Sequence, residues 1–323
     1  MVRIGYALSS EEFGPNDLVR LAVRAEEAGF EFAKLSDHYL PWVESQGQSP
    51  FAWAVLGAIA HSTSKLEVGT GVTCPIIRYH PALVAQMAAT VECMMPGRFI
   101  LGVGAGEFLN EHIYGDAFPP PDLRHEMLVE AIDIMRTLWK GGFQQYHGNY
   151  YEVQEARIYT LPEKPPRIQM AADGPQAART AAACADGLIA VKPDRDLVSA
   201  YRDAGGEGPI VGQVSVCYAD SEPEAKRIAR EAWPNSALEG QANWDIRSPR
   251  LFDGLVKGVT EDQVAQAIIC GPDPRRHLDA IQQFADAGFD QVYVHNVGKE
   301  QERFFRFYEK QIIPQLRGVP THE

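Results

Sequence analysis

A cluster of reactive side chains follows a short apolar segment near the amino terminus. The predicted strand 30–35 is followed by Asp37, His38 and Trp42, and Pro41 interrupts regular structure between the last two. An imidazole titrates near neutral pH and can take a proton from a hydroxyl group, and an indole N–H can hold the oxygen that remains. Three polar residue types after one strand favour a functional site over a buried structural histidine. The cluster predicts alcohol oxidation.

Carboxylates occur at two other places where a strand is predicted to end. Glu107 follows the glycine-rich segment 102–106. There it could relay protons, or it could favour the start of the next helix through its charge. Glu11 and Glu12 follow the first predicted strand, where a role in a pocket and a solvated surface position are both open.

The elements that must position these groups alternate along the whole chain between strand-like segments and amphipathic helical patterns. That alternation is typical of parallel βα units. Strands are predicted at residues 4–8, 30–35, 66–72, 98–104, 168–171, 187–191, 210–218 and 291–297. Helices are predicted at residues 16–28, 51–61, 81–95, 123–139, 175–185, 194–203, 222–232 and 301–316, with Gly29 and Gly288 at two helix ends. Eight such pairs predict the α/β class and a closed (β/α)8 TIM barrel, with function at the carboxyl ends of its strands.

Three regions interrupt the alternation. Residues 107–122, 140–167 and 234–260 read as long loops, the last with room for a short helix. Insertions of this length in a barrel are usually lids or substrate walls. No linker divides the chain, so residues 1–323 are expected to form a single domain with these insertions.

Composition narrows the partners and the compartment. The formal net charge of −13 disfavours nucleic acid and anionic membranes as partners. The five cysteines are widely spaced, which fits a reduced, cytoplasmic protein. The longest apolar stretch, residues 51–60, is about half a membrane span, and no apolar signal segment is present at the amino terminus.

Several other chemistries lack their motifs. The sequence contains no Cys-x-x-Cys and no His-Glu-x-x-His, so no metal site is expected. It contains no Gly-x-Ser-x-Gly elbow and no Walker loop. The glycines of segment 102–106 have the wrong spacing for a Rossmann nicotinamide site.

Five motifs, in order along residues 4–316, resemble those of the luciferase-like barrel superfamily, and more narrowly those of the deazaflavin-dependent glucose-6-phosphate dehydrogenase group. They are Ser36-Asp37-His38 with Pro41-Trp42, the segment GTGVTCP at 69–75, RYHP at 78–81, GAGEFLNE at 104–111, and Ala171-Ala172 with Gly174-Pro175. The resemblance implies a (β/α)8 barrel that binds coenzyme F420, whose deazaflavin ring carries a hydride. It also implies a homodimer, for which the apolar segments 51–60 and 81–95 are candidate interfaces.

The resemblance carries roles over to individual residues. It implies that His38 is the base, that Trp42 holds the reacting oxygen, and that Glu107 and Glu11 are catalytic carboxylates. It implies coenzyme contacts at Asp37, Gly71, Val72, Cys74, Gly106, Asn110, Ala171, Ala172 and Gly174. It further implies a cis peptide bond between Gly71 and Val72.

The sequence departs from this group where the group holds its sugar phosphate. Two segments differ, AVKP at 190–193 and LFDG at 251–254. Asp173 also places a charge where the group has a small neutral residue. The remaining candidate cations for the substrate are Lys192, Lys257, Arg275 and Arg276.

The leading hypothesis is therefore an F420-dependent dehydrogenase that takes hydride from a sugar, a sugar phosphate or an alcohol. The alternatives are a reductase that uses reduced F420, an FMN-dependent monooxygenase on the same barrel, and a non-catalytic barrel that binds a coenzyme or a ligand.

Overall fold

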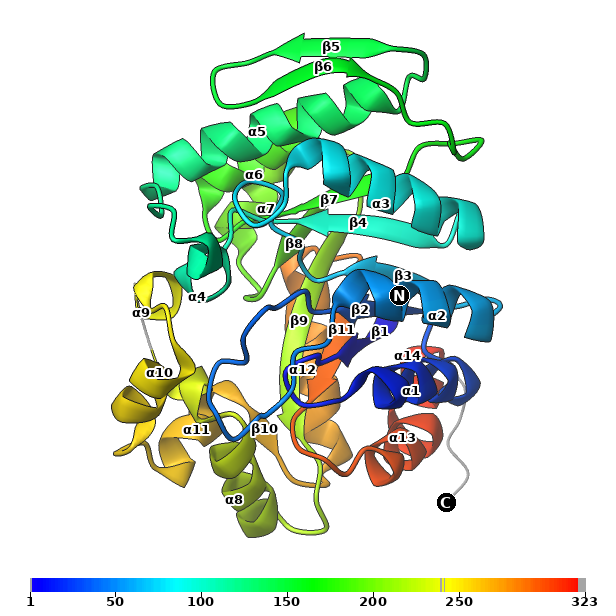
Figure 1. Ribbon diagram of the computed structural model, residues 1–323. Helices are drawn as coiled ribbons and strands as arrows, with labels where there is room; N and C mark the ends of the chain where they lie inside the picture. Colours follow the sequence, from blue (N-terminus) through cyan, green and yellow to red (C-terminus); the bar gives the residue numbers. More distant parts are fainter. Residues whose placement is uncertain (1, 239, 241, 319–323) are drawn as a thin grey trace.

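Eight parallel strands close into a barrel in a computed structural model that describes residues 2–238, 240 and 242–318 (Figure 1). Around the barrel the order is β1 (Arg3–Leu8), β2 (Phe32–Leu35), β3 (Glu67–Thr70), β4 (Phe99–Val103), β7 (Arg167–Ala171), β8 (Leu188–Ala190), β9 (Ile210–Cys217) and β11 (Gln291–Asn296), which pairs with β1 again. A short strand, β10 (Ile269–Cys270), extends the sheet from β9. The predicted α/β TIM barrel is confirmed, and all eight predicted strands form it.

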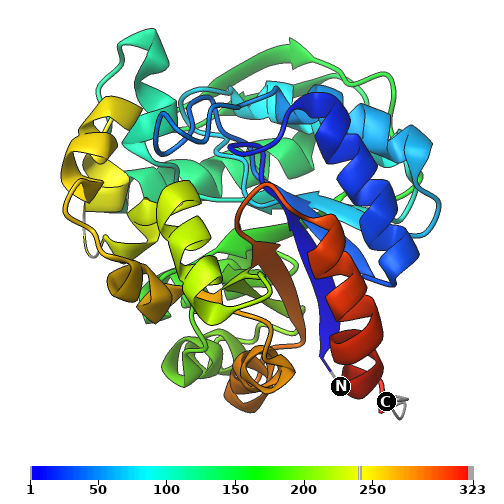
Figure 2. The ribbon, with the colours of Figure 1, turned by 90° about the horizontal axis from the view of Figure 1, so that it is seen from below.

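Helices surround the barrel, and most lie where the amphipathic patterns predict them. They are α1 (Pro15–Ala28), α2 (Ala52–Ser62), α3 (Pro81–Met94), α5 (Pro121–Leu138), α6 (Pro175–Cys184), α7 (Arg195–Asp203), α8 (Glu222–Ala232), α12 (Pro274–Ala287) and α13 (Glu302–Phe307), which continues through the π-helical turn η3 (Tyr308–Ile312) into α14 (Ile313–Leu316). Figure 2 shows the carboxy-terminal helix beside β1, and the rings of Tyr6 and Phe305 pack there at 4.8 Å.

Helix α12 is absent from the predicted set, although its end at Gly288 was expected. Gly288 has φ of 97° and Gly29, at the end of α1, has φ of 90°, so both glycines supply the left-handed conformation that ends a helix. The buried residues of α12, His277, Ile281, Phe284 and Ala287, recur at helical spacing. The sequence therefore carries the pattern of this helix, and the prediction missed it.

The insertions contain more regular structure than the sequence predicts. Residues 107–122 include α4 (Phe108–Glu111) and the 3-10 turn η1 (His112–Tyr114), and residues 140–167 include the antiparallel hairpin β5 (Gln144–His147) and β6 (Glu152–Ala156) outside α5. Residues 234–260 include the 3-10 turn η2 (Pro234–Ala237), α9 (Ala242–Asp245) and α10 (Pro249–Val256), and α11 (Glu261–Ala267) follows. Elements of four or five residues are too short for a periodic pattern to show. Helices α4 and α9 contact each other, so the first and third insertions meet in space (Figure 1).

The interior of the barrel combines apolar and polar side chains. Phe32, Ile189, Val211 and Tyr293 form a buried cluster within it. Beside them the Lys34 ammonium donates a hydrogen bond of 2.6 Å to Gln169 Oε1. A larger apolar core lies between the strands and the helices. The polar groups inside the barrel therefore need partners within the protein or in a bound ligand.

Two predictions concern what surrounds the protein, namely a membrane and a second copy of the chain. No helix within the described residues is long and apolar enough to cross a membrane. Leu83 and Met94 of α3 are about half exposed, as is Phe51 directly before α2. The homodimer through these two helices stays a prediction.

Candidate functional site

A cavity of about 520 Å³ opens at the carboxyl ends of the barrel strands. Every barrel strand, or the segment directly after it, contributes to its wall. The turn η2 and helix α9 of the third insertion add Asn235, Ser236 and Trp244. Of the residues proposed from the sequence, those that line the cavity are Glu11, His38, Trp42, Gly71, Val72, Gly106, Glu107, Ala171 and Ala172.

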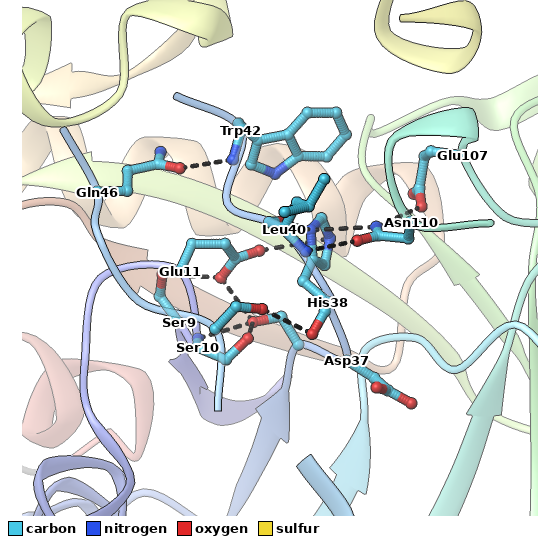
Figure 3. A network of polar contacts seen from close by, with 12 residues as sticks. Ser9, Ser10, Glu11, Asp37, His38, Leu40, Trp42, Gln46, Glu107 and Asn110 are labelled. Carbon is cyan, nitrogen blue, oxygen red and sulfur yellow. Dashed lines mark hydrogen bonds and ion pairs between the residues drawn. The ribbon is translucent and has the colours of Figure 1, made fainter. Parts of the chain in front are cut away.

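His38 lies at one side of this cavity with contacts to both ring nitrogens (Figure 3). Its Nε2 is 3.4 Å from Glu11 Oε1. Its Nδ1 is 3.1 Å from the carbonyl oxygen of Leu40 and 3.2 Å from the amide nitrogen of Asn110. These partners hold the ring in one orientation, and the Glu11 carboxylate stabilises the ring when it carries a proton.

Glu11 is itself held by hydroxyl groups. Its Oε2 accepts hydrogen bonds from Ser36 Oγ at 2.7 Å and from Ser9 Oγ at 3.1 Å. Burial raises the pKa of Glu11, but the His38 imidazole and the Ser36 hydroxyl more than offset burial, so the pKa lies below its usual value. Glu11 is therefore a carboxylate at neutral pH, although only 3% of the residue is exposed.

Trp42 lies against His38, with ring centroids 5.2 Å apart. Its backbone N–H donates to Gln46 Oε1 at 2.9 Å, which anchors the loop after β2. The ring of Phe252, from α10, packs edge-on against the indole at 5.4 Å. The third insertion thus packs against the indole through the segment LFDG at 251–254.

Asn110 connects His38 to Glu107 from behind the cavity wall. Its Oδ1 accepts from the backbone N–H groups of Tyr39 and Leu40, at 2.8 and 3.2 Å, which directs its amide nitrogen toward His38. The same nitrogen lies 3.4 Å from Glu107 Oε2. Asn110 does not line the cavity, so its place is that of a positioning residue.

Asp37 and Cys74 also lie behind the wall. Asp37 Oδ2 accepts from Thr73 Oγ1 at 2.7 Å, and Asp37 Oδ1 pairs with Arg78 at 3.1 Å. The backbone N–H of Arg78 donates to Glu111 Oε2 at 2.7 Å. Burial, opposed by Arg78, raises the pKa of Glu111 to about 7. This buried network fixes the backbone between Asp37 and His38.

Small residues at or directly after the ends of β3, β4 and β7 shape another part of the cavity wall. The peptide bond between Gly71 and Val72 is cis, as the resemblance implies. A Cβ atom on Gly104 would lie 2.7 Å from Val72 Cγ2, and one on Gly106, which has φ of 76°, would lie 2.5 Å from Cys74 Sγ. With Ala171 and Ala172 on the next strand, these positions leave space for a flat ring close to the backbone. Gly174 caps the start of α6 and does not line the cavity.

The four candidate substrate cations are not brought into this site. Lys192, Lys257 and Arg275 are exposed on the surface. Arg276 donates to the carbonyl of Cys270 at 2.9 Å and pairs with Glu222. Among the described residues, no group of three or more histidines, cysteines, aspartates or glutamates could hold a metal ion.

Several lining residues were not proposed as site residues from the sequence. They are Lys34, Arg124, His125, Gln213, Trp233, Asn235, Ser236, Trp244, Tyr293 and His295. Alternation along β2, β9 and β11 could have identified the inward-facing strand positions, since every second residue faces the barrel interior. The residues of the third insertion carry no such signal, because its path is set by packing.

Lys34 gives a testable property of the cavity floor. Burial lowers the pKa of Lys34 from 10.5 to about 7, with Glu67 opposing the shift and Arg167 adding to it. Between these values the unfolded chain binds more protons than the native protein, so Lys34 should make stability rise with pH, by up to about 1.4 kcal/mol per pH unit. Urea unfolding from about pH 7 to pH 10 should show this slope in the wild type and lose it in Lys34→Met. An equal slope in both proteins would contradict the assignment.

Comparisons with known proteins agree with this geometry. The profile of the family described as "Luciferase-like monooxygenase" matches residues 1–291. An F420-dependent glucose-6-phosphate dehydrogenase of Microbacterium testaceum (strain StLB037) is 36% identical over 330 residues, covering 98% of each chain. F420-dependent glucose-6-phosphate dehydrogenase 1 of Rhodococcus jostii (strain RHA1) is 34% identical, covering 99% of each chain. The solved structure of an F420-dependent secondary alcohol dehydrogenase with an F420-acetone adduct superimposes with a TM-score of 0.89 at 28% identity, covering 97% of this chain and 98% of that one.

Proposed function

Because this chain belongs to the luciferase-like monooxygenase family, we propose that it is a dehydrogenase that uses coenzyme F420 to oxidise a hydroxyl-bearing carbon. The observation that carries the proposal is the position of His38, Glu11, Trp42 and Glu107 along one cavity. Those four residues come from three separate strand ends. The similarity to F420-dependent dehydrogenases of sugar phosphates and secondary alcohols supports the coenzyme and the type of donor.

The residues of the cavity fit a deazaflavin ring. Gly104 and Gly106 lie so close to their neighbours that neither could carry a side chain, which leaves a flat surface of backbone. The coenzyme would contact Gly71, Val72, Gly106, Ala171 and Ala172, all of which line the cavity. Bound F420 would supply a two-electron hydride acceptor. Asp37, Cys74 and Asn110 do not line the cavity, so they would affect coenzyme binding indirectly, by holding residues that do. Gly174 would do so by fixing where α6 begins.

The chain's own groups manage the hydroxyl proton. His38 takes that proton at Nε2, while Nδ1 stays in contact with the carbonyl of Leu40. The Glu11 carboxylate, 3.4 Å away, stabilises the imidazolium that forms. The indole of Trp42 holds the substrate oxygen beside His38, and Glu107, linked to His38 through Asn110, provides a second carboxylate in the cavity wall.

An uncharged donor fits the cavity better than a phosphate ester. Of the described lysines and arginines, Lys34 and Arg124 line it. Lys34 is bonded to Gln169, and Arg124 donates to the carbonyl of Gly106 at 2.7 Å. Three carboxylates also line the cavity, those of Glu11, Glu107 and Asp173. The indole rings of Trp42, Trp233 and Trp244 form further parts of its wall. A phosphate dianion would therefore face three carboxylates against two cations, and Gln169 and the carbonyl of Gly106 already hold those two cations in place.

We therefore expect kcat/KM for an alcohol or a free sugar to exceed that for its phosphate ester. The difference should be about fivefold or more, since a close pair of like charges costs about 1 kcal/mol even when well solvated. Glucose and glucose 6-phosphate, compared at equal ionic strength, provide a matched pair. A preference for the phosphate ester would refute the uncharged donor and leave the dehydrogenase proposal standing.

The function is tested by mixing the purified protein with oxidised F420 and a panel of alcohols, sugars and sugar phosphates. The expected result is loss of the visible absorbance of F420 with at least one donor. No reduction with any of them, or FMN bound in the purified protein, would count against the proposal.

A further inference from the structure

A second pair of imidazole and carboxylate lies beside the first. Glu11 and Glu12 are consecutive, yet each faces a different histidine. Glu11 Oε1 is 3.4 Å from His38 Nε2, and Glu12 Oε2 is 3.3 Å from His295 Nε2 at the end of β11. Glu12 is 2% exposed and His295 is 4% exposed. The mechanism above does not use this second pair.

The two members of this pair face different cavities. His295 lines the cavity that holds His38. Glu12 lines a second cavity of about 370 Å³, to which Gln46, Glu231 and Lys299 also contribute. The pair therefore forms part of the wall between the two spaces.

Neighbouring groups hold the pair in this bridging position. Glu12 Oε1 accepts from the backbone N–H of Gly298 at 2.9 Å, which leaves Oε2 for the histidine. Trp233 packs edge-on against the His295 ring at 4.5 Å. The titratable and charged groups that face the pair are Tyr6, Glu11, Cys217 and Lys299.

Oxidation of an alcohol leaves a proton in the reaction cavity that has to reach solvent. The hydride leaves with both electrons of the C–H bond, so the hydroxyl proton stays on the base. His38 must lose that proton before another turnover, while substrate and coenzyme fill the reaction cavity. A second cavity reached through a buried pair offers a separate exit.

We propose that His295 and Glu12 carry this proton from the reaction cavity to the second cavity, an inference that rests on the proposed dehydrogenase function. The proton passes from His38 to Glu11, which lies next to Glu12 in the chain, and from Glu11 to Nδ1 of His295. Nε2–H of His295 gives up its proton to Glu12 Oε2, and Glu12 releases it to water in the second cavity. One proton enters at Nδ1 and another leaves from Nε2, so His295 changes tautomer and must exchange its ring proton or flip its ring before the next transfer. No electron moves, so the step needs no further reactant.

The test compares Glu12→Gln and His295→Gln with Glu231→Gln, which removes an equal charge from an exposed residue of the second cavity. With enzyme in excess over F420, a single round of coenzyme reduction should stay within about twofold of wild type in all three proteins, because proton exit follows hydride transfer. In steady state, kcat of the first two should fall by about tenfold or more and should show a larger solvent isotope effect. Added imidazole should restore part of the lost kcat. Glu231→Gln should behave as wild type.

A readout without coenzyme or turnover accompanies these rates. In ¹⁵N-labelled apoprotein the Nε2–H signal of His295 should shift in Glu12→Gln and stay unchanged in Glu231→Gln. Unchanged kcat in both pair variants, or an equal loss in the single round, would overturn proton exit through this pair. An inactive wild type would instead refute the dehydrogenase function, and the exit route with it.

Discussion

His38→Ala is expected to lower kcat for alcohol oxidation by about a hundred- to ten-thousand-fold, the usual contribution of a positioned general base. The imidazole contacts Glu11 on one side and Leu40 and Asn110 on the other, so it is oriented before substrate arrives. Without it, the hydroxyl proton has no imidazole to accept it beside Trp42. Binding of F420 should change little, because the small residues proposed to hold the ring lie on other strands.

The measurement is kcat for a donor identified in the panel, together with equilibrium binding of F420. His61→Ala provides the control, since His61 is exposed in the last turn of α2. Turnover of His38→Ala close to that of the control would remove His38 from the mechanism. Loss of F420 binding in step with turnover would assign His38 to the coenzyme rather than to the proton.

Arg78→Met is expected to have the largest effect on stability, a loss of about 3–5 kcal/mol in the free energy of unfolding. Arg78 is 7% exposed, and its guanidinium donates to Asp37 at two atoms, at 2.8 and 3.1 Å. Its Nε lies 3.7 Å from Glu111. Methionine fills much of the same volume but leaves two buried carboxylates without their cation.

Urea unfolding measures this loss, and Arg20→Met, which removes an exposed ion pair with Asp17, should cost no more than about 1 kcal/mol. The Arg78→Met loss should be smaller at about pH 5 than at about pH 8. The pKa of Glu111 is about 7, so this carboxyl is neutral in the native protein at the lower pH and needs no cation. A loss no greater than that of Arg20→Met at either pH would show that the buried pair contributes little.

The eight strands were predictable because each is a short apolar run followed by residues that end a strand. The chain also placed His38, Trp42 and Glu107 directly after such runs, and a parallel barrel brings those positions to one face. The β5–β6 hairpin escaped prediction for the opposite reason, because its short strands bury little apolar surface and depend on what they pack against. Helix α12 was missed although its buried residues follow helical spacing.

Some residues of the candidate site were likewise predictable from the sequence, and the places of others were not. Local sequence indicated the base and its tryptophan, but Asp37, Cys74 and Asn110 carry polar types that point equally to a cavity or to its support. The tertiary structure places these three behind the wall, where Asp37 pairs with Arg78 and Asn110 orients His38. It also leaves Lys192 and Lys257 on the surface.

The sequence alone determined the barrel, the end of the barrel at which chemistry is expected, and the residue types available there. These follow from hydrophobic periodicity and from strand order, which are local properties of the chain. Only the tertiary structure decided which carboxylate faces which histidine, and that Glu12 and His295 separate two cavities. Contacts between residues nearly three hundred positions apart depend on how strands and insertions pack, and no pattern within one segment records that distance.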